Sequence, residues 1–195
     1  YMMTYTELYT LLKSCICDCL GAALHSGRVR EAYQQSDAPQ FTINDDVVVT
    51  YLTEKDDPYS HQRNTIYEET NDSVILHHKG TRVWDLHCYC YGPNSYEMAD
   101  LIRSHILTSQ LKSKLHRHNV ALVPTIPTIQ SMPEQAQGQW WSRWDITLTF
   151  NESYDYTEDV GTIDHIHTTV GIAKSPNQID LSKTKTFNDM FTTNR

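Results

Sequence analysis

The stretch RWDITLTFN (143–151) decides the fold. Apolar and polar side chains alternate along it, and the apolar ones are Trp144, Ile146, Leu148 and Phe150. Successive side chains of a β-strand point to opposite faces of the sheet, so this pattern places one face in a core and the other outside it. We expect a strand close to the centre of a sheet.

Four other stretches predict strands. In RVWDLHCYCY (82–91), one face carries Trp84, Leu86, Cys88 and Cys90, while the other carries Val83, Asp85, His87 and Tyr89. The β-branched run DVVVTYL (46–52) is typical of a short buried strand. Two short stretches, 65–69 and 74–78, are separated by Thr-Asn-Asp-Ser and predict a hairpin with an Asn-Asp turn.

Helical spacing of apolar residues recurs in three segments. The first is 4–24, with Thr4 or Thr6 as the N-cap, Glu7 in the first turn and Gly21 near the end. The second begins at Ser95, and the third is shorter and begins at Ser109. The expected inward side chains of these two are Met98, Leu101, Ile102, His105, Leu111 and Leu115.

The remaining segments are expected to be connections. We predict an extended connection at 29–41, a polar acidic loop at 53–64, a brief strand at 120–123 and a long proline-containing loop at 124–138. An acidic linker at 152–161 and a weaker strand at 162–172 follow. Beyond Ala173 the chain is polar and reads as an arm that orders, if at all, against a partner.

The order of elements predicts an α+β fold. We expect a single domain over 1–172, with a mostly antiparallel sheet and helices packed on one face, followed by an extended C-terminal arm over 173–195. A doubly wound fold is disfavoured because strands and helices do not alternate steadily.

Charge is unevenly distributed along the 195 residues, whose formal net charge is −8. The segment from Asp37 to Asp72 contains nine acidic and two basic residues. The segment 101–133 contains no acidic residue and four Lys or Arg residues. This asymmetry fits head-to-tail packing of identical subunits, and it equally fits a solvated surface. It disfavours recognition of nucleic acid through phosphates. No apolar run reaches the ~18–20 residues that a membrane-spanning helix requires.

The cysteines and histidines are candidate metal ligands. The chain has five cysteines, and we expect free thiols in a reducing compartment because Cys15, Cys17 and Cys19 cannot converge from one helix. His77, His78 and His87 with the Cys88/Cys90 pair could supply zinc ligands, but thiols buried as small hydrophobic groups are favoured. Asp164, His165 and His167 form the alternative centre, which would need a further ligand.

No catalytic motif is present in the sequence. No nucleophile lies in a glycine-framed turn, and no glycine-rich phosphate loop occurs among only seven glycines. Adjacent carboxylates such as Asp56 and Asp57 project in different directions and are expected to be solvated. We therefore predict a non-enzymatic protein without a metal or cofactor.

An aromatic and guanidinium cluster marks the most plausible contact surface. Trp140, Trp141 and Arg143 lie at the start of the strongest strand, and aromatic residues and Arg dominate buried subunit contacts. Trp144 is assigned to the core. The full set of candidate interface residues is Trp140, Trp141, Arg143, Arg117, Lys112, Lys114, Asp56 and Asp57.

In this order the features resemble the neck and tail terminator family of tailed bacteriophages, also called tail completion proteins. The resemblance spans about 4–172 and is carried by VREAYQQSDAP, CYGPNSYEMADLIRSHI, LKSKLHRHNVALV and MPEQAQGQWWSRWDITLTF. Its most specific part is the Tyr-Gly-Pro-Asn strand end followed by two helices, a polar loop and Trp-x-x-Arg-Trp-Asp. The cysteine-rich first helix and the tail after Ala173 depart from the family pattern.

The resemblance implies a structural virion protein that is assembled in the bacterial cytoplasm. Such a protein forms a ring, expected to be hexameric, between the head connector or head-completion protein and the tail tube, with a sheath outside the tube if the tail contracts. Genomic DNA passes through the lumen, and no membrane is involved. The loops at 53–64 and 124–141 and the tail at 174–195 are expected to contact neighbours. Two alternatives are a metal-dependent hydrolase or nuclease using Asp164, His165 and His167, and a host oligomer with a binding role.

Overall fold

The computed structural model describes residues 2–21, 26–33, 41–69, 73–136 and 138–161, and short strands at 167–169, 172–175, 178–180 and 184–186. The chain divides into two compact units, of which the first comprises Tyr1–Ile66 with His77–Thr157 and the second Tyr67–Leu76 with Glu158–Arg195. The first unit contains the helices and the core, and it is the unit described below unless the second is named.

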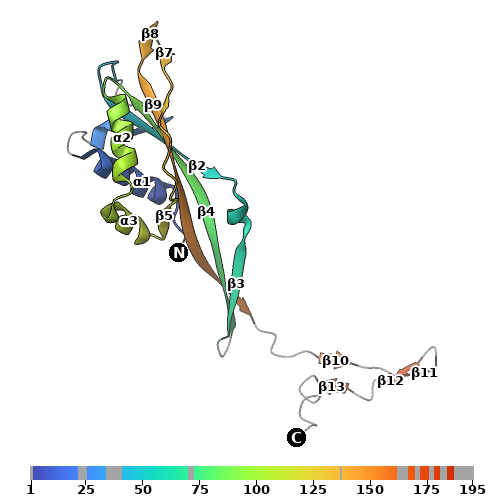
Figure 1. Cartoon of the computed structure of the whole chain (residues 1–195). Helices are drawn as coiled ribbons and strands as arrows, with labels where there is room; N and C mark the ends of the chain where they lie inside the picture. Colours follow the sequence, from blue (N-terminus) through green and yellow to red (C-terminus); the bar gives the residue numbers. More distant parts are fainter. Residues whose placement is uncertain are drawn as a thin grey trace. The chain divides into compact units, whose positions relative to one another are not determined.

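A seven-stranded sheet is the centre of the fold (Figure 1). Its strand order is β1-β2-β4-β9-β5, with β3 paired to β4 and β6 paired to β9. The strand predicted from RWDITLTFN begins β9 and lies inside the sheet, between β4 and β5, as expected. The strand bounds are β1 Val29–Glu31, β2 Val47–Lys55, β3 Arg63–Glu69, β4 Ser73–Tyr91, β5 Val120–Leu122, β6 Gln130–Ser131 and β9 Arg143–Gly161.

Pairing in this sheet is mostly antiparallel. β2 runs antiparallel to β4, with Val48 opposite Cys90 and Leu52 opposite Leu86. β5 and β6 are both antiparallel to β9, whereas β1 is parallel to β2. The α+β prediction with a mostly antiparallel sheet is confirmed.

Helices α1 (Tyr5–Leu20), α2 (Ser95–His105) and α3 (Ser109–His116) lie on one side of the sheet (Figure 1). α1 starts with a reciprocal cap, in which Thr4 Oγ1 accepts the amide of Glu7 at 3.3 Å and Glu7 Oε2 accepts the amide of Thr4 at 2.8 Å. It ends at Gly21, whose φ of 65° is a conformation that glycine tolerates.

The core lies between the helices and the sheet. Cys15 and Cys19 are buried in it and Cys17 is partly exposed, as the helical spacing predicts. Trp84 is buried, and Trp144 packs against the core as a partly buried side chain. The fully enclosed side chains include Leu8, Leu12, Ile16, Leu86, Cys88, Ile102, Leu115, Ile146, Leu148 and Phe150.

Glu152 is a buried carboxylate in β9, with only 1% of its surface exposed. Arg82 donates to it through Nη2 at 2.8 Å and Nε at 3.1 Å, and Trp84 Nε1 donates at 3.0 Å. The amide of Met3 donates at 3.3 Å, and Arg82 Nη2 also donates to the carbonyl of Met3. This network compensates the buried charge and ties the segment before α1 to two strands of the sheet.

The two longest strands correct the prediction. The segments 74–78 and 82–91 are one 19-residue strand, β4, and the expected acidic linker at 152–161 is the second half of the 19-residue strand β9. Each of these strands contains a residue that is typical of a turn or loop in the sequence, and the strand continues through it. Gly80 in β4 gives room to the ring of Tyr154, whose Cζ lies 2.5 Å from where a Cβ would stand. Glu152 in β9 is held by Arg82 and Trp84.

Shorter segments also differ from expectation. Val29–Glu31 is strand β1 rather than a connection, because it pairs in parallel with β2. The predicted loop 53–64 contains the end of β2, the 3₁₀ turn η3 (Pro58–His61) and the start of β3. The predicted loop 124–138 contains β6 and β7 (Glu134–Ala136), and β7 pairs with β8 (Gln139–Trp141).

Details of two helices were also predicted wrongly. Leu101 and His105, both expected inside, are exposed, Leu101 to 38%, while Ala99 is buried. The N-cap position of α2 is Asn94 rather than Ser95, and that of α3 is Thr108 rather than Ser109. Leu111 and Leu115 are buried as predicted. The Asn-Asp turn predicted at 70–73 and the end of the first helix at 22–24 fall largely on residues outside the described ranges.

The second unit contains short strand pairs. β10 (His167–Thr169) is antiparallel to β13 (Thr184–Thr186), and β11 (Ile172–Ser175) is antiparallel to β12 (Gln178–Asp180). The weaker strand predicted at 162–172 therefore has regular structure at 167–169, and the rest of it lies mostly outside the described residues. The C-terminal arm, predicted without regular elements, contains β12 and β13.

Candidate functional site

The β7–β8 hairpin presents an exposed tryptophan. The hairpin pairs Glu134 with Trp141 and Ala136 with Gln139, and it carries Trp140 with 67% of its surface exposed. In the segment that leads into it, Ile126 is 75% exposed and Met132 is 51% exposed. We call these three side chains, Ile126, Met132 and Trp140, the hairpin surface. Exposed large apolar side chains mark a contact site where they form a contiguous patch, and single ones are ordinary on protein surfaces.

Arg143 secures the base of this hairpin. Its guanidinium donates to both oxygens of Asp145 at 2.8 and 2.7 Å and to Glu134 at 3.1 Å, and it lies 4.4 Å from the centre of the Tyr89 ring. The hydrogen bonds to Asp145 hold the pKa of Arg143 above its usual range. Tyr91 donates to Glu134 at 2.9 Å, and burial raises its pKa to about 12. Arg143 therefore stays charged and is engaged within the chain.

Trp141 is also engaged within the chain. Its Nε1 donates to the carbonyl of Ala136 at 3.3 Å, and its ring meets Phe41 edge to face at 5.6 Å. Of the three aromatic and Arg candidates from the sequence, Trp140 alone points its side chain largely to solvent. Trp141 and Arg143 position the hairpin, and Trp140 is left available to a partner.

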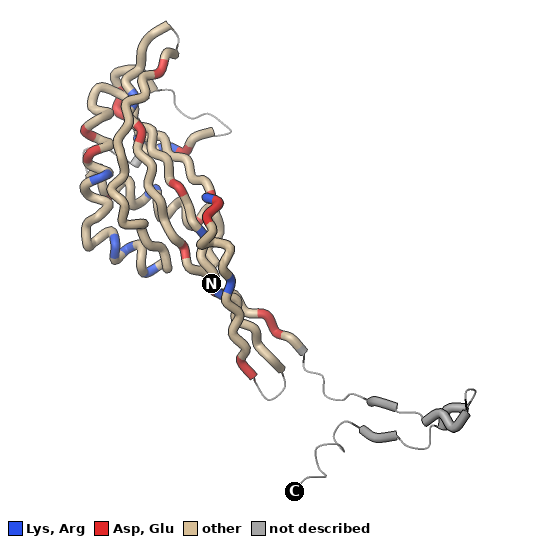
Figure 2. Tube along the Cα trace, turned by 45° about the vertical axis from the view of Figure 1, so that its right-hand side comes forward, with Lys and Arg blue, Asp and Glu red and all other residues tan. Residues whose placement is uncertain are grey.

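The charged candidates lie on α3, in the turn after it and at η3. α3 and the turn after it carry exposed Lys112 and Arg117, while Lys114 is paired to Asp18 at 2.6 Å. Asp56 and Asp57 lie at η3, and Tyr59 of η3 lines the same cavity as Asn119, which follows α3. Figure 2 shows both basic and acidic segments on the helices and on the strands.

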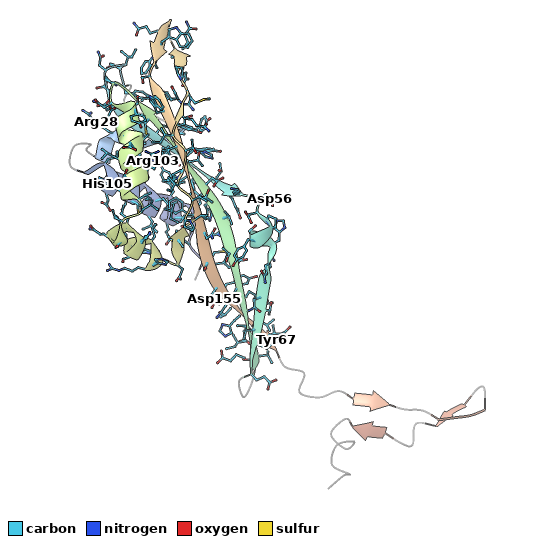
Figure 3. All side chains as sticks on the ribbon, viewed as in Figure 1. Arg28, Asp56, Tyr67, Arg103, His105 and Asp155 are labelled. Carbon is cyan, nitrogen blue, oxygen red and sulfur yellow. The ribbon has the colours of Figure 1, made fainter. Side chains whose placement is uncertain are left out.

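Each carboxylate beside η3 has a local role. Asp57 caps the turn by accepting the amide of Tyr59 at 2.9 Å, and Asp56 accepts from His61 Nε2 at 2.9 Å. The Asp56 side chain is 90% exposed and projects from the edge of the body (Figure 3). Tyr59, between them and His61, is 62% exposed. Sequence reasoning missed Tyr59, although the Asp-Pro pair before it is a recognisable signal for the start of a helical turn.

A groove of about 540 Å³ lies between α1 and the turn after α3. The buried Met3 and Leu11 form its apolar part, and Arg117 and His118 line the opposite side with their exposed side chains. We call it the α1 groove. The remaining lining residues are Thr6, Glu7, Thr10, Ser14 and Asn119.

Neither thiol chemistry nor a metal cluster has a basis in the described residues. Burial raises the pKa of Cys15 to about 11 and that of Cys19 to about 12, so these thiols stay protonated at neutral pH. Cys88 and Cys90 face the core, whereas His87 lies on the opposite face of β4. No group of three or more His, Cys, Asp or Glu residues that could hold a metal occurs in the described part of the chain. Asp164 and His165 lie outside that part, and nothing is described of the His167 side chain.

The comparisons with known proteins decide the family. The family model described as phage neck terminator protein matches residues 6–174, which is most of the chain. The chain belongs to this family. As a neck terminator it is a structural protein of the phage tail and neck. No curated protein is similar enough to count as a match.

The match to the neck terminator family covers the surfaces described above. η3, the turn after α3, the β7–β8 hairpin and all of α1 except Tyr5 fall within residues 6–174. Among the described residues of this neck terminator, no helix is long and apolar enough to cross a membrane.

Proposed function

We propose that this neck terminator is the subunit of a closed ring, expected to be a hexamer, that ends the tail tube and joins it to the head connector. The match of the family over residues 6–174 is the observation that supports this proposal most strongly. Identical subunits that contact one another head to tail generate a ring when the rotation between them closes. A ring at this position leaves a central passage for the genome.

The hairpin surface supports a contact with the ring above or below. Ile126, Met132 and Trp140 are exposed, and no charged residue occurs between Asn119 and Pro133. Interface centres are depleted of charge and enriched in aromatic residues and Met, which is the composition found here. We infer that the hairpin surface packs against a neighbouring protein of the neck, either the connector or the tail tube.

The net charge supports passage of DNA rather than binding to it. The chain carries −8 overall, and phosphate recognition would require a concentrated basic surface. A lumen of acidic subunits repels phosphates and lets a duplex slide without being held. The exposed Lys112 of α3 is then available for a contact between proteins, whereas Lys114 is already paired to Asp18.

The proposal is tested in phage that lack the chain. We expect such phage to accumulate filled heads and separate tails, and we expect the chain supplied in trans to restore joined particles. Electron microscopy of the lysate distinguishes heads, tails and complete particles. Complete, infectious particles formed without the chain would overturn the proposed function.

The C-terminal arm provides a second test. Deletion of 174–195 is expected to reduce assembly of tailed particles while the helix-covered unit stays folded, because that unit contains none of these residues. Circular dichroism of the shortened chain and the yield of tailed particles measure the two effects separately. Normal assembly by the shortened chain would remove the arm from the proposal.

A further inference from the structure

We propose that the β7–β8 hairpin enters an uncharged, apolar cleft of a neighbouring neck protein, which encloses the hairpin on both of its faces. This inference rests on the proposed contact of the hairpin surface with the connector or the tail tube. It adds how the two proteins meet and what chemistry the partner offers.

The hairpin continues the central sheet as a two-stranded ribbon. Ser131 of β6 is opposite Trp144 of β9, and Gln135 of β7 is opposite Trp140 of β8. Both pairs belong to one register, so the alternation of side chains along β9 continues through β8 without a shift. Figure 1 shows β7 and β8 extending beyond the end of α2.

Each face of this ribbon carries one large exposed apolar side chain. Neighbours along a strand point to opposite faces, so Trp140 shares the face of Trp144, whose ring meets Tyr96 of α2 edge to face at 5.0 Å. Met132 is opposite Arg143, to whose carbonyl its amide donates at 2.9 Å, and these two share the other face. Trp140 is 67% exposed and Met132 is 51% exposed. The hairpin surface therefore has two sides.

Neither face of the ribbon is covered within the described residues. Every residue from Gln130 to Gln135 is exposed, and so are Gln139 and Trp140. A two-stranded ribbon without a covering layer is at best marginally stable in water, so such a ribbon gains from any surface that buries it. A flat partner would bury Trp140 or Met132 but not both. A cleft buries both, and aromatic and Met side chains are enriched at the centres of interfaces.

The hairpin presents almost no charge to its partner. Glu134 is the only charged residue between Asn119 and Ser142. Its carboxylate accepts from Arg143 Nη1 at 3.1 Å and from the hydroxyl of Tyr91 at 2.9 Å, so it is already bound within the chain. Charged groups are depleted at the centres of interfaces, and an apolar cleft is the surface that fits this composition.

Glu134 also fixes the hairpin to the sheet. Tyr91 is the last residue of β4 and Arg143 is the first residue of β9, so one carboxylate on β7 is held from two strands. The contact of Trp141 with Phe41 adds an apolar support on the same face. A ribbon that is already positioned loses little conformational entropy when it enters a cleft. Glu134 is therefore a positioning residue for the contact.

Protection of cysteines in purified particles tests the contact on both faces. In a Cys17→Ser background, Met132→Cys and Gln135→Cys each place one thiol on the ribbon, and the two thiols lie on opposite faces. Both thiols are expected to react with a maleimide reagent in the purified chain and to lose most of that labelling in joined particles. Labelling after the particles are unfolded in urea is the control, and it is expected to recover both thiols.

Arginine substitution tests the chemistry of the cleft. Met132→Arg and Gln135→Arg are each expected to reduce the yield of joined particles strongly, because each brings a charge into apolar surroundings. Gln110→Arg, at an exposed residue of α3, is the matched control and is expected to leave the yield near normal. Thermal denaturation is expected to show nearly equal stability for the three variants, because all three side chains are exposed.

Two substitutions at Glu134 test its positioning role. Glu134→Ala is expected to reduce the yield of joined particles, because it releases β7 from Tyr91 and Arg143. Glu134→Gln keeps an acceptor for the Tyr91 hydroxyl and is expected to recover part of the yield. A normal yield from Glu134→Ala would overturn the positioning role.

The outcomes separate the enclosed hairpin from the proposed function. Protection of one thiol only, or a reduced yield from one arginine variant only, would show a contact on a single face and would overturn the cleft while the ring subunit stands. Equal labelling of both thiols in particles and in the purified chain would also overturn it. Protection of both thiols already in the purified chain would assign the cleft to a second copy and would overturn a different protein as the partner. Joined particles formed without the chain would overturn the proposed function itself.

Discussion

The indole nitrogen of Trp84 donates a 3.0 Å hydrogen bond to the carboxylate of Glu152, a side chain that is 1% exposed. Trp84 is on β4 and Glu152 is on β9, so the bond connects the two longest strands. Arg82 and the amide of Met3 complete the network. It closes one end of the core under the start of α1, beside the α1 groove that contains Met3.

Replacement of Glu152 by Ala is expected to destabilise the fold strongly. The change leaves Arg82 and Trp84 without their acceptor, and removal of one partner of a buried charged pair costs about 3–5 kcal/mol. Urea denaturation measures the free energy of unfolding. Asp155→Ala, a change at a more exposed carboxylate of the same strand, is the control and is expected to cost much less. Equal losses for the two variants would contradict a special role for Glu152.

Gly80 and Tyr154 are expected to be energetically coupled. A Cβ at residue 80 would stand 2.5 Å from Cζ of Tyr154, so Gly80→Ala forces the ring to move. In a Tyr154→Ala background the space is already open, and Gly80→Ala is expected to cost little. A double-mutant cycle with thermal denaturation is expected to give a coupling energy in the range of about 0.5–3 kcal/mol. Additive effects of the two changes would show that the ring does not depend on the glycine.

Stability is expected to fall at alkaline pH. Burial raises the pKa of Cys19 to about 12 from an ordinary value of 9.0, so the folded chain keeps a proton that the unfolded chain releases. The stabilisation is complete below pH 9 and is lost as the pH rises from there toward 12. The free energy of unfolding at pH 7, 9 and 10.5 measures it, and Cys19→Ala is expected to flatten the decline. A free energy of unfolding that rises with pH over this interval would contradict the burial of the Cys19 thiol.

Trp140 and Trp141 are expected to have separate roles. Trp140→Ala is expected to leave thermal stability nearly unchanged, because the ring is 67% exposed, and to reduce the yield of joined particles. Trp141→Ala is expected to lower the melting temperature, because it removes the contacts with Ala136 and Phe41. Calorimetry and particle counts distinguish the two. A normal particle yield from Trp140→Ala would exclude the hairpin surface as a contact with the neck.

Local pattern predicted the elements whose side chains repeat regularly. The alternation in β9 and β4, the apolar stripe of α1 and the inward leucines of α3 follow from periods of two and 3.6 residues, and all are found. The local pattern gave a wrong prediction where a residue distant in the sequence stabilises a strand through a residue that is typical of loops or turns. Glu152 looks like a loop residue until Arg82 is known to neutralise it, and Gly80 looks like a break until Tyr154 is known to cover it.

The candidate site was likewise predictable from the sequence only in part. Trp140 was predicted as an anchor because aromatic residues beside a strand end are conspicuous in the sequence, and its exposure agrees with an anchor role. The α1 groove could not be predicted, because its walls come from residues 3–14 and 117–119. Only the folded chain brings these two segments together.

Quantification of the chain in purified virions, together with imaging of the neck, tests the ring most directly. The account predicts a copy number close to that of a single hexameric ring and a ring of density at the junction of head and tail that is missing when the chain is absent. Virions that carry no copies of the chain, with a complete neck, would contradict it.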